Sequence, residues 1–289
     1  MRTITRKPTP CILLPTDFQQ PARRAFTYAL KLATVLGARL DLVHVIKTIS
    51  GPGQVTPDYR SLNPLKTSAL LELGRMARTA NEAGICAEPS LLYGTPMDGI
   101  LDRATRVHAR LIVMGTHGRT GWDRMRLGST ALAVVREAPC PVLTLQEVVA
   151  RDSFRHHAKV SVARLLVATD FSSCADGMVR YAAQLAGKLG AQICLLHASD
   201  EGEAELLAQR KLNGVKRGLE REGVPVEAVC MPGDPVEVIL EQAEGWQADV
   251  IAVGTQGRTG LRRLVLGSVT EAVLRRAGCP VLIANHRQR

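Results

Sequence analysis

Glycine, serine and arginine recur at a fixed spacing in a segment whose chemistry suits a phosphate group. Gly115, Gly118, Gly128 and Ser129 follow the pattern G-x2-G-x9-G-S. Gly118 permits a sharp turn that brings the backbone close to a ligand. We expect a helix to begin at Gly128-Ser129, with Ser129 capping it while its hydroxyl and the neighbouring N–H groups face an anion. Arg119 adds positive charge inside the loop.

The same spacing occurs a second time, at Gly254, Gly257, Gly267 and Ser268, with Arg258 inside the loop. One such motif alone is common, and a Gly-Ser pair before a helix is ordinary capping. Its repetition at the same place in two units makes phosphate binding the favoured interpretation. The loop is not a Walker A motif, because no Gly-Lys-Ser/Thr follows, and the G-x-G-x-x-G of dinucleotide binders is absent. Further arginines lie in the two loops: Arg124, Arg126, Arg262 and Arg263.

An aspartate follows the first apolar run of each unit, and a histidine ends the second run. Asp17 and Asp170 are either turn or helix-capping residues, or carboxylates that bond a ribose hydroxyl or assist a metal held on phosphates. The residues alone leave both interpretations open. His44 and His197 lie in apolar runs, where a buried, hydrogen-bonded histidine is more common than a metal ligand. Val45 and Ala198, which follow them, could offer main-chain groups to a base.

The two units are copies of one another. Leu36-Gly37-Ala38 returns as Leu189-Gly190-Ala191, and Cys140-Pro141-Val142-Leu143 returns as Cys279-Pro280-Val281-Leu282. The offset between matching residues falls from 153 early in the unit to 139 later, so the first copy carries a net insertion of 14 residues. We place the insertion in a long loop over Lys47–Leu62, which ends beside Asn63-Pro64. The second copy has the short acidic turn Asp200–Glu203 there.

Short apolar runs alternate with helical periodicity in each copy. This alternation predicts a parallel sheet with helices on both faces, whose ligands bind beyond the carboxyl ends of the strands. In the first copy we expect strands at Cys11–Leu14, Leu40–Val45, Ala87–Leu92, Leu111–Met114 and Val142–Leu145. Helices are expected at Arg24–Leu36, Leu65–Ala83, Met97–Thr105 and Ser129–Glu137.

Composition excludes several classes of function. The chain has 289 residues and 46% hydrophobic residues, which predicts two globular domains, 1–150 and 151–289. Aromatic residues make up only 3%, too few for stacking platforms on single-stranded nucleic acid. The net charge of +10 comes with no nucleic-acid reader motif, so we expect no specific nucleic-acid binding.

The seven cysteines form no CxxC pair, and no apolar run approaches the ~20 residues that span a bilayer. We therefore expect a cytoplasmic protein without a membrane partner.

Together, the glycine loop, the Asp after the first strand and the His-Val after the second resemble the universal stress protein family, in particular its ATP-binding subgroup. Each copy resembles a whole domain of that family. The resemblance implies two tandem, doubly wound α/β domains of the Rossmann-like HUP type, each with a five-stranded parallel sheet. It also implies that the last strands join the copies as an internal pseudo-dimer; these strands are Val142–Leu145 and Val281–Ala284. Whether two whole chains also form a homodimer is left open.

The resemblance implies a nucleotide site in each copy. The ligand would be ATP, or ADP or AMP, with Mg²⁺ on its phosphates and Asp17 and Asp170 as candidate metal contacts. In the first copy the implied contacts are Asp17, Val45, Gly115, Thr116, Gly118, Arg119, Gly128, Ser129 and Thr130. In the second copy they are Asp170, Ala198, Gly254, Thr255, Gly257, Arg258, Gly267, Ser268 and Val269.

Three departures from the family pattern concern single positions. Arg110 stands where the second copy has Asp249, Gln256 replaces His117, and Ala198 replaces the usual valine. The smaller Ala198 and the acidic turn beside it predict weaker nucleotide binding in the second copy.

The leading hypothesis is a stress-response protein that holds ATP as a structural or signalling ligand. Slow hydrolysis is the most that we expect, because no nucleophile–base pair or paired carboxylates stand out. The alternatives are a nucleotide-independent scaffold for unidentified protein partners, and an adenylate-transferring or pyrophosphatase enzyme. The enzyme is the weaker alternative, since Thr16-Asp17-Phe18-Gln19 stands where such enzymes carry a Ser-Gly-Gly loop.

Overall fold

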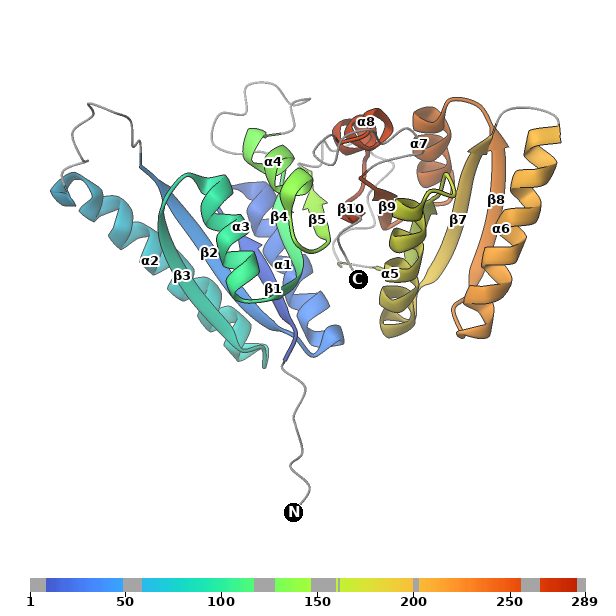
Figure 1. Ribbon diagram of the computed structural model, residues 1–289. Helices are drawn as coiled ribbons and strands as arrows, with labels where there is room; N and C mark the ends of the chain where they lie inside the picture. Colours follow the sequence, from blue (N-terminus) through green and yellow to red (C-terminus); the bar gives the residue numbers. More distant parts are fainter. Residues whose placement is uncertain are drawn as a thin grey trace, which may run out of the picture.

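The two copies form one continuous sheet (Figure 1). The computed structural model describes residues 9–48, 59–116, 128–146, 160, 162–199, 203–255 and 266–284. Within these ranges the strands form a 10-stranded sheet in the order β3-β2-β1-β4-β5-β10-β9-β6-β7-β8. Strands β3 and β8 therefore lie at its two ends, and β5 and β10 meet in the middle.

Each copy alternates strands and helices, as the sequence predicts. The first copy contains β1 (Cys11–Pro15), α1 (Gln20–Leu36), β2 (Arg39–Lys47), α2 (Tyr59–Glu82), β3 (Ala87–Gly94), α3 (Pro96–Arg106), β4 (Ala109–Gly115), α4 (Ser129–Glu137) and β5 (Val142–Leu145). The second contains β6 (Arg164–Ala168), α5 (Ser173–Leu189), β7 (Gln192–Ser199), α6 (Glu203–Arg221), β8 (Val226–Pro232), α7 (Pro235–Gly245), β9 (Val250–Gly254), α8 (Ser268–Arg276) and β10 (Val281–Ala284).

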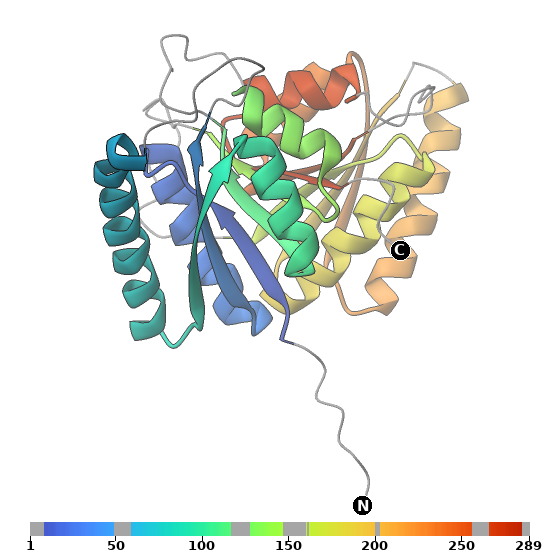
Figure 2. The same ribbon diagram turned by 60° about the vertical axis from the view of Figure 1, so that its left-hand side comes forward.

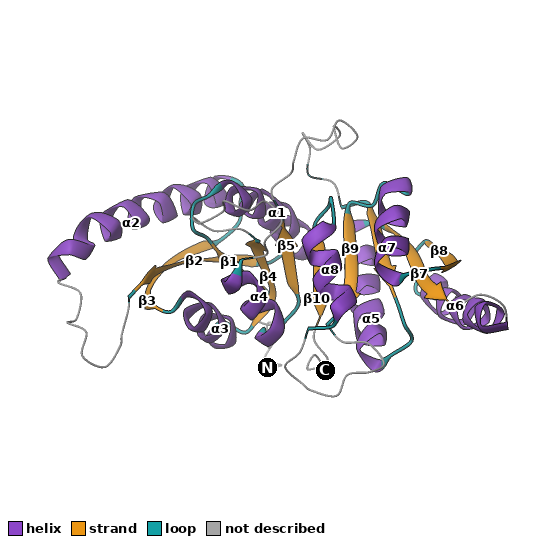
Figure 3. Ribbon diagram, turned by 90° about the horizontal axis from the view of Figure 1, so that it is seen from above, coloured by secondary structure: helices purple, strands orange, loops and turns teal. Residues whose placement is uncertain are grey.

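Helices cover both faces of the sheet. Seen from above, α1 and α2 lie on one side of the first copy's strands, and α3 and α4 lie on the other (Figure 3). In the side view, α3 stands in front of the strands (Figure 2). Because successive strand residues point to opposite faces, Ile12 and Leu14 pack towards α1 and α2 while Leu13 packs towards α3 and α4. The fold class predicted from the sequence is confirmed.

The centre of the sheet joins the two copies. Strands β5 and β10 pair antiparallel, with Leu143 opposite Leu282, and the Thr144 hydroxyl donates to the Val281 carbonyl at 3.1 Å. Both apolar clusters, one on each face, contain buried residues from both copies. The copies therefore share their cores.

Several predicted boundaries were wrong. Helix α1 begins at Gln20, four residues before the predicted start, because Pro21 is compatible with a first helical turn. Helix α2 begins at Tyr59 and contains Pro64, although we placed Asn63-Pro64 beside a loop. Pro64 is the sixth residue of the helix, so it removes the N–H that would bond to the carbonyl four positions earlier, and the helix forms despite that loss.

The long loop is correspondingly shorter than predicted. Lys47 belongs to β2, residues 59–62 belong to α2, and residues 49–58 lie outside the described part. In the second copy Glu203 is the first residue of α6 rather than part of the turn, and residues 200–202 are not described. The domain boundary predicted at residues 150 and 151 also lies outside the described ranges. No described helix is both long and apolar enough to cross a membrane.

Candidate functional site

The predicted site residues that the structure describes lie at the carboxyl edge of each half-sheet. In the first copy the chain runs outward from β1 to β2 and β3, then returns to place β4 on the other side of β1. The strand order thus reverses between β1 and β4, and this switch point is where α/β folds bind ligands. Asp17 follows β1, and Gly115 ends β4. The second copy repeats this arrangement with β6 and β9.

The glycine loop is closed at its base by a hydrogen bond. The Gly128 N–H donates to the Thr116 carbonyl at 2.7 Å, and the Thr116 N–H donates to the Leu145 carbonyl at 2.9 Å. In the second copy Gly267 donates to Thr255 at 2.8 Å. The loop therefore leaves the sheet and returns to it at one point. Its own residues, including Gly118, Arg119, Gly257 and Arg258, lie outside the described ranges.

Helices α4 and α8 begin directly after the closed loop, and their starts differ from our prediction. Gly128 and Gly267, rather than the serines, are the N-cap residues, and neither helix start has a side-chain cap. Ser129 and Ser268 each occupy the first helical position. The prediction that Ser129 caps the helix was wrong because Gly128 already has the extended backbone of an N-cap (φ −60°, ψ 140°). The N–H groups of the first turn consequently point out of the helix without an intrahelical acceptor.

Gly115 is required for packing between strand and helix, and Gly254 makes the equivalent close approach in the second copy. A Cβ at Gly115 would meet Pro21 Cβ at 2.8 Å and the Ala22 nitrogen at 2.9 Å. At Gly254 the nearest atom would be Cys174 Sγ, at 3.1 Å. These glycines let the ends of β4 and β9 approach the first helix of each copy. Their presence is thus explained without a ligand, although their place at the switch point is the predicted one.

The aspartates occupy turns, and the histidines are hydrogen bonded. Asp17 Oδ1 accepts from the Gln19 N–H at 3.0 Å, and Asp170 Oδ1 accepts from the Ser172 N–H at 3.0 Å. Nδ1 of His44 and of His197 lies 2.7 Å from the carbonyl oxygen of Thr16 and Thr169, respectively. Both histidines are therefore satisfied by the backbone, as expected. No group of three or more potential metal ligands occurs among the described residues.

Val45 and Ala198 are half-buried at the ends of β2 and β7. A Cβ on Gly99 of α3 would lie 3.1 Å from Val45 Cγ2, so Val45 fills the space beside this glycine. In the second copy the residue equivalent to Gly99 is the buried Val238 of α7. The larger apolar side chain is thus on the strand in the first copy and on the helix in the second.

Asp249 has a structural role that Arg110 cannot share. Asp249 Oδ2 accepts from the N–H groups of Ala163 and Arg164 at 2.7 and 3.0 Å, where the chain enters β6. In the first copy, Pro10 occupies the position of Ala163, and proline has no N–H. A carboxylate at position 110 would therefore lack one of these two donors.

The charge around the two sites differs. The N-termini of α1 and α4 carry no acidic residue in their first turn, whereas α5 carries Asp176 and α8 carries Glu271. Lys211 of α6 lies 5.4 Å from the Phe171 ring centroid and adds a positive charge. On balance the helix starts of the second copy are the more acidic, which disfavours an anion there.

Sequence reasoning missed the residues that hold the turn after the first strand. Thr16 and Thr169 accept the backbone N–H of Phe18 and Phe171 through their side-chain oxygens. Each phenylalanine ring packs against the histidine of its copy, with centroids 4.6 and 4.5 Å apart. The repeated Thr-Asp-Phe was a visible signal, but the contact with a histidine distant in sequence was not.

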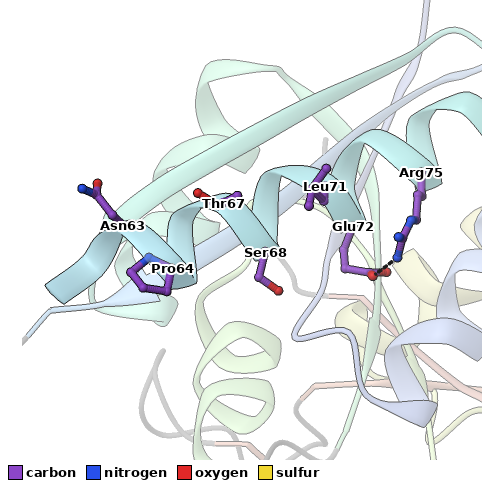
Figure 4. Close-up of a pocket in the computed structure, with 7 residues that line it drawn as sticks. All are labelled: Asn63, Pro64, Thr67, Ser68, Leu71, Glu72 and Arg75. Carbon is purple, nitrogen blue, oxygen red and sulfur yellow. Dashed lines mark hydrogen bonds and ion pairs between the residues drawn. The ribbon is translucent and has the colours of Figure 1, made fainter. Parts of the chain in front are cut away.

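One surface hollow contains none of the predicted site residues. It lies along the outer face of α2 and is bordered by residues of that helix alone (Figure 4). Glu72 and Arg75, two of these residues, form an ion pair at 2.5 Å. The bordering residues are Asn63, Pro64, Thr67, Ser68, Leu71, Glu72 and Arg75.

Two parallel α/β units, each with the reversal of strand order that marks doubly wound folds, define the fold class, and comparison with known proteins identifies the family. The universal stress protein family model matches residues 11–146 and 162–285. The chain therefore belongs to the universal stress protein family, and it contains two copies of the family's domain.

Individual relatives agree. A universal stress protein of Methanocaldococcus jannaschii is 33% identical over 136 residues, which are 42% of this chain and 80% of the relative. One from Mycobacterium tuberculosis is 29% identical over 215 residues, covering 69% of each chain. The crystal structure of a universal stress protein from Archaeoglobus fulgidus superposes with a TM-score of 0.78 at 25% identity, covering 96% of this chain and 98% of that chain. This likeness spans both copies.

Proposed function

We propose that the chain is an ATP-binding universal stress protein, in which adenine nucleotide serves as a structural or signalling ligand in the cytoplasm. The observation that carries the proposal is the closed glycine loop, present twice, from which a helix without a side-chain cap begins at the switch point. The positive end of such a helix and its outward N–H groups suit a phosphate.

The described residues fit a nucleotide and its magnesium ion. Ser129 and Thr130 begin α4, and Asp17 lies after the neighbouring strand β1. Within the described part of the chain, Asp17 engages only Oδ1 in a hydrogen bond, so Oδ2 is available to a ribose hydroxyl or to a hydrated cation. Magnesium would neutralise the phosphate charge, while Val45 would contact the base.

We infer further that the two sites bind unequally, with the first copy the stronger. The acidic residues in the first turns of α5 and α8 support weaker binding in the second copy. The carboxylate of Asp234 supports it too, because it caps α7 by accepting from the N–H groups of Val236 and Glu237. The corresponding helix α3 has no side-chain cap. The antiparallel pairing of β5 with β10 supports the expected internal pseudo-dimer.

The test measures nucleotide retained by the purified chain. The protein is denatured, and released ATP, ADP and AMP are quantified by chromatography. Gly118→Leu and Gly257→Leu should each reduce the retained nucleotide, with the larger loss from Gly118→Leu, and the double variant should retain none. Gly187→Leu is the matched control, because a Cβ at Gly187 meets nothing within 4 Å. Retention by the double variant equal to that of the control would refute the assignment of these loops.

A second candidate is a partner-binding scaffold that needs no nucleotide. Exposed leucines on α2 and α6 favour it: Leu71 is 58% exposed, Leu206 66% and Leu207 57%. Leu70 and Leu71 are adjacent on α2, as are Leu206 and Leu207 on α6, and exposed apolar surface marks interaction sites where it is contiguous. Partner capture that survives in the double variant would favour the scaffold.

A further inference from the structure

The turn after the first strand has the same unusual conformation in both copies. Phe18 has φ +67° and Phe171 has φ +60°, in the left-handed region that bulky residues rarely adopt. Such a conformation is strained and persists only where surrounding contacts impose it. Its occurrence at equivalent positions, next to Asp17 and Asp170, shows that it is part of the fold unit rather than an isolated irregularity.

One histidine in each copy helps to hold this conformation, together with the Thr16 and Thr169 hydroxyls that accept from the Phe18 and Phe171 N–H groups. The Thr16 carbonyl can only accept a hydrogen bond, so Nδ1 of His44 must carry the hydrogen that it donates over 2.7 Å. The same imidazole packs against Phe18, with 29° between the ring planes. His197 makes the equivalent bond to Thr169 and packs against Phe171 at 42°. Each histidine thus contacts the residues on both sides of the aspartate.

The aspartate between these two contacts has little freedom. Its backbone is fixed by the bonded carbonyl before it and the packed ring after it, and its Oδ1 is held by the N–H of the residue two positions later. For Asp17 this leaves the direction of Oδ2 set by the turn. The carboxylate is therefore oriented before any ligand arrives, which lowers the entropic cost of binding.

We propose that His44 and His197 are positioning residues for ligand binding, which act by orienting Asp17 and Asp170 at the switch points. The inference rests on the proposed function, since it takes the ligand to be a nucleotide that the aspartate contacts through a ribose hydroxyl or a bound cation. The histidines themselves need not touch the ligand. Because both the neutral Nδ1–H tautomer and the imidazolium carry the required hydrogen, the bond to threonine survives protonation.

Two substitutions separate the hydrogen bond from the ring packing. His44→Phe keeps an aromatic ring beside Phe18 but removes the donor, whereas His44→Asn places a side-chain N–H close to the position of Nδ1 and removes the ring. ATP with Mg²⁺ is titrated calorimetrically into the full chain carrying Gly257→Leu, so that the first site dominates the signal. We expect His44→Phe to weaken binding about tenfold and His44→Asn to remain within about threefold of the parent.

A double-mutant cycle shows whether the histidine acts through the aspartate. Asp17→Ala should weaken binding, and adding His44→Phe to it should cause no further loss, because the oriented group is already gone. Arg106→Ala is the control, since Arg106 is exposed at the end of α3. Urea unfolding of each variant verifies that it is folded at the titration temperature.

Each outcome decides a separate question. Unchanged affinity in His44→Phe, or losses that multiply in the Asp17→Ala/His44→Phe variant, would overturn the positioning role while leaving the proposed function intact. If the chain without any substitution binds no adenine nucleotide, the proposed function fails, and the positioning role fails with it.

Discussion

At the scale of single residues, the clearest difference between the copies is a buried ion pair. Asp41 on β2 is fully buried, and Arg103 of α3 donates to both of its oxygens, with Nε–Oδ1 at 3.0 Å and Nη2–Oδ2 at 2.6 Å. These bonds raise the pKa of the Arg103 guanidinium. The second copy has Cys194 and Gln242 at the same positions, with Sγ and Nε2 3.7 Å apart. A neutral pair thus links the same strand and helix without charge.

This difference predicts what happens when the ion pair of the first copy is replaced by the neutral pair of the second. Arg103→Gln should destabilise the chain by about 3 kcal/mol, because it leaves the Asp41 carboxylate buried without its principal partner. The double variant Asp41→Cys/Arg103→Gln should recover most of that loss, since it recreates the neutral pair. Urea unfolding measures both effects, with exposed Arg106→Gln as the control. A loss in Arg103→Gln no larger than in the control would contradict the expectation.

At the scale of elements, a large residue at the end of the second strand and a small one on its covering helix are exchanged between the copies, which we interpret as compensation in volume. Val45 with Gly99 in the first copy corresponds to Ala198 with Val238 in the second. The large side chain comes from the strand in one case and from the helix in the other. The strand prediction alone could not reveal this compensation, because it depends on which helix residue faces the strand end.

The compensation predicts non-additive substitutions. Gly99→Val should destabilise the first copy by about 1–3 kcal/mol, because even its Cβ would lie 3.1 Å from Val45 Cγ2. Val45→Ala in the same chain should relieve the contact, so that the double variant is more stable than Gly99→Val alone. Thermal unfolding measures the difference. Gly74→Val is the matched helical control, since a Cβ at Gly74 meets nothing within 4 Å. Additive losses would show that the two positions do not compensate.

At the scale of the whole molecule, the two copies are joined by a shared sheet and shared cores. Leu143 and Leu282 face each other across β5 and β10 and are 3% and 1% exposed. Packing of this kind is typical of the inside of one domain rather than of a mobile contact between two. The polar Thr144 at the same junction is satisfied by the Val281 carbonyl.

We therefore expect the chain to unfold in a single cooperative transition. Differential scanning calorimetry should show one peak whose calorimetric and van't Hoff enthalpies agree. Leu282→Ala should lower the stability of the whole chain by about 2–5 kcal/mol and leave one peak, because it removes apolar volume from a core that both copies share. Leu206→Ala, at an exposed position, is the control. Two resolved peaks in the parent chain would show that the copies unfold independently.

Much of this architecture was predictable from the sequence because the relevant signals are local. Apolar runs, helical periodicity and the repeated glycine motif placed the strands, most helices and both loops at the carboxyl edges. The failures were at element ends: Pro64 did not prevent a helix from beginning before it, and Gly128 rather than Ser129 became the N-cap. Such ends depend on how a helix docks on the sheet, which outweighs local preferences of about 1 kcal/mol at a cap and about 3 kcal/mol for a proline inside a helix.

The sequence by itself determined the duplication, the α/β order and the position of each glycine loop after the fourth strand of its copy. Only the tertiary structure decided how those loops are closed, why Gly115 must be a glycine, and that His44 holds the turn carrying Asp17. The physical reason is the range of the interactions. Repeats and periodicity are visible along the chain, whereas a hydrogen bond from residue 44 to residue 16 exists only once two strands lie side by side.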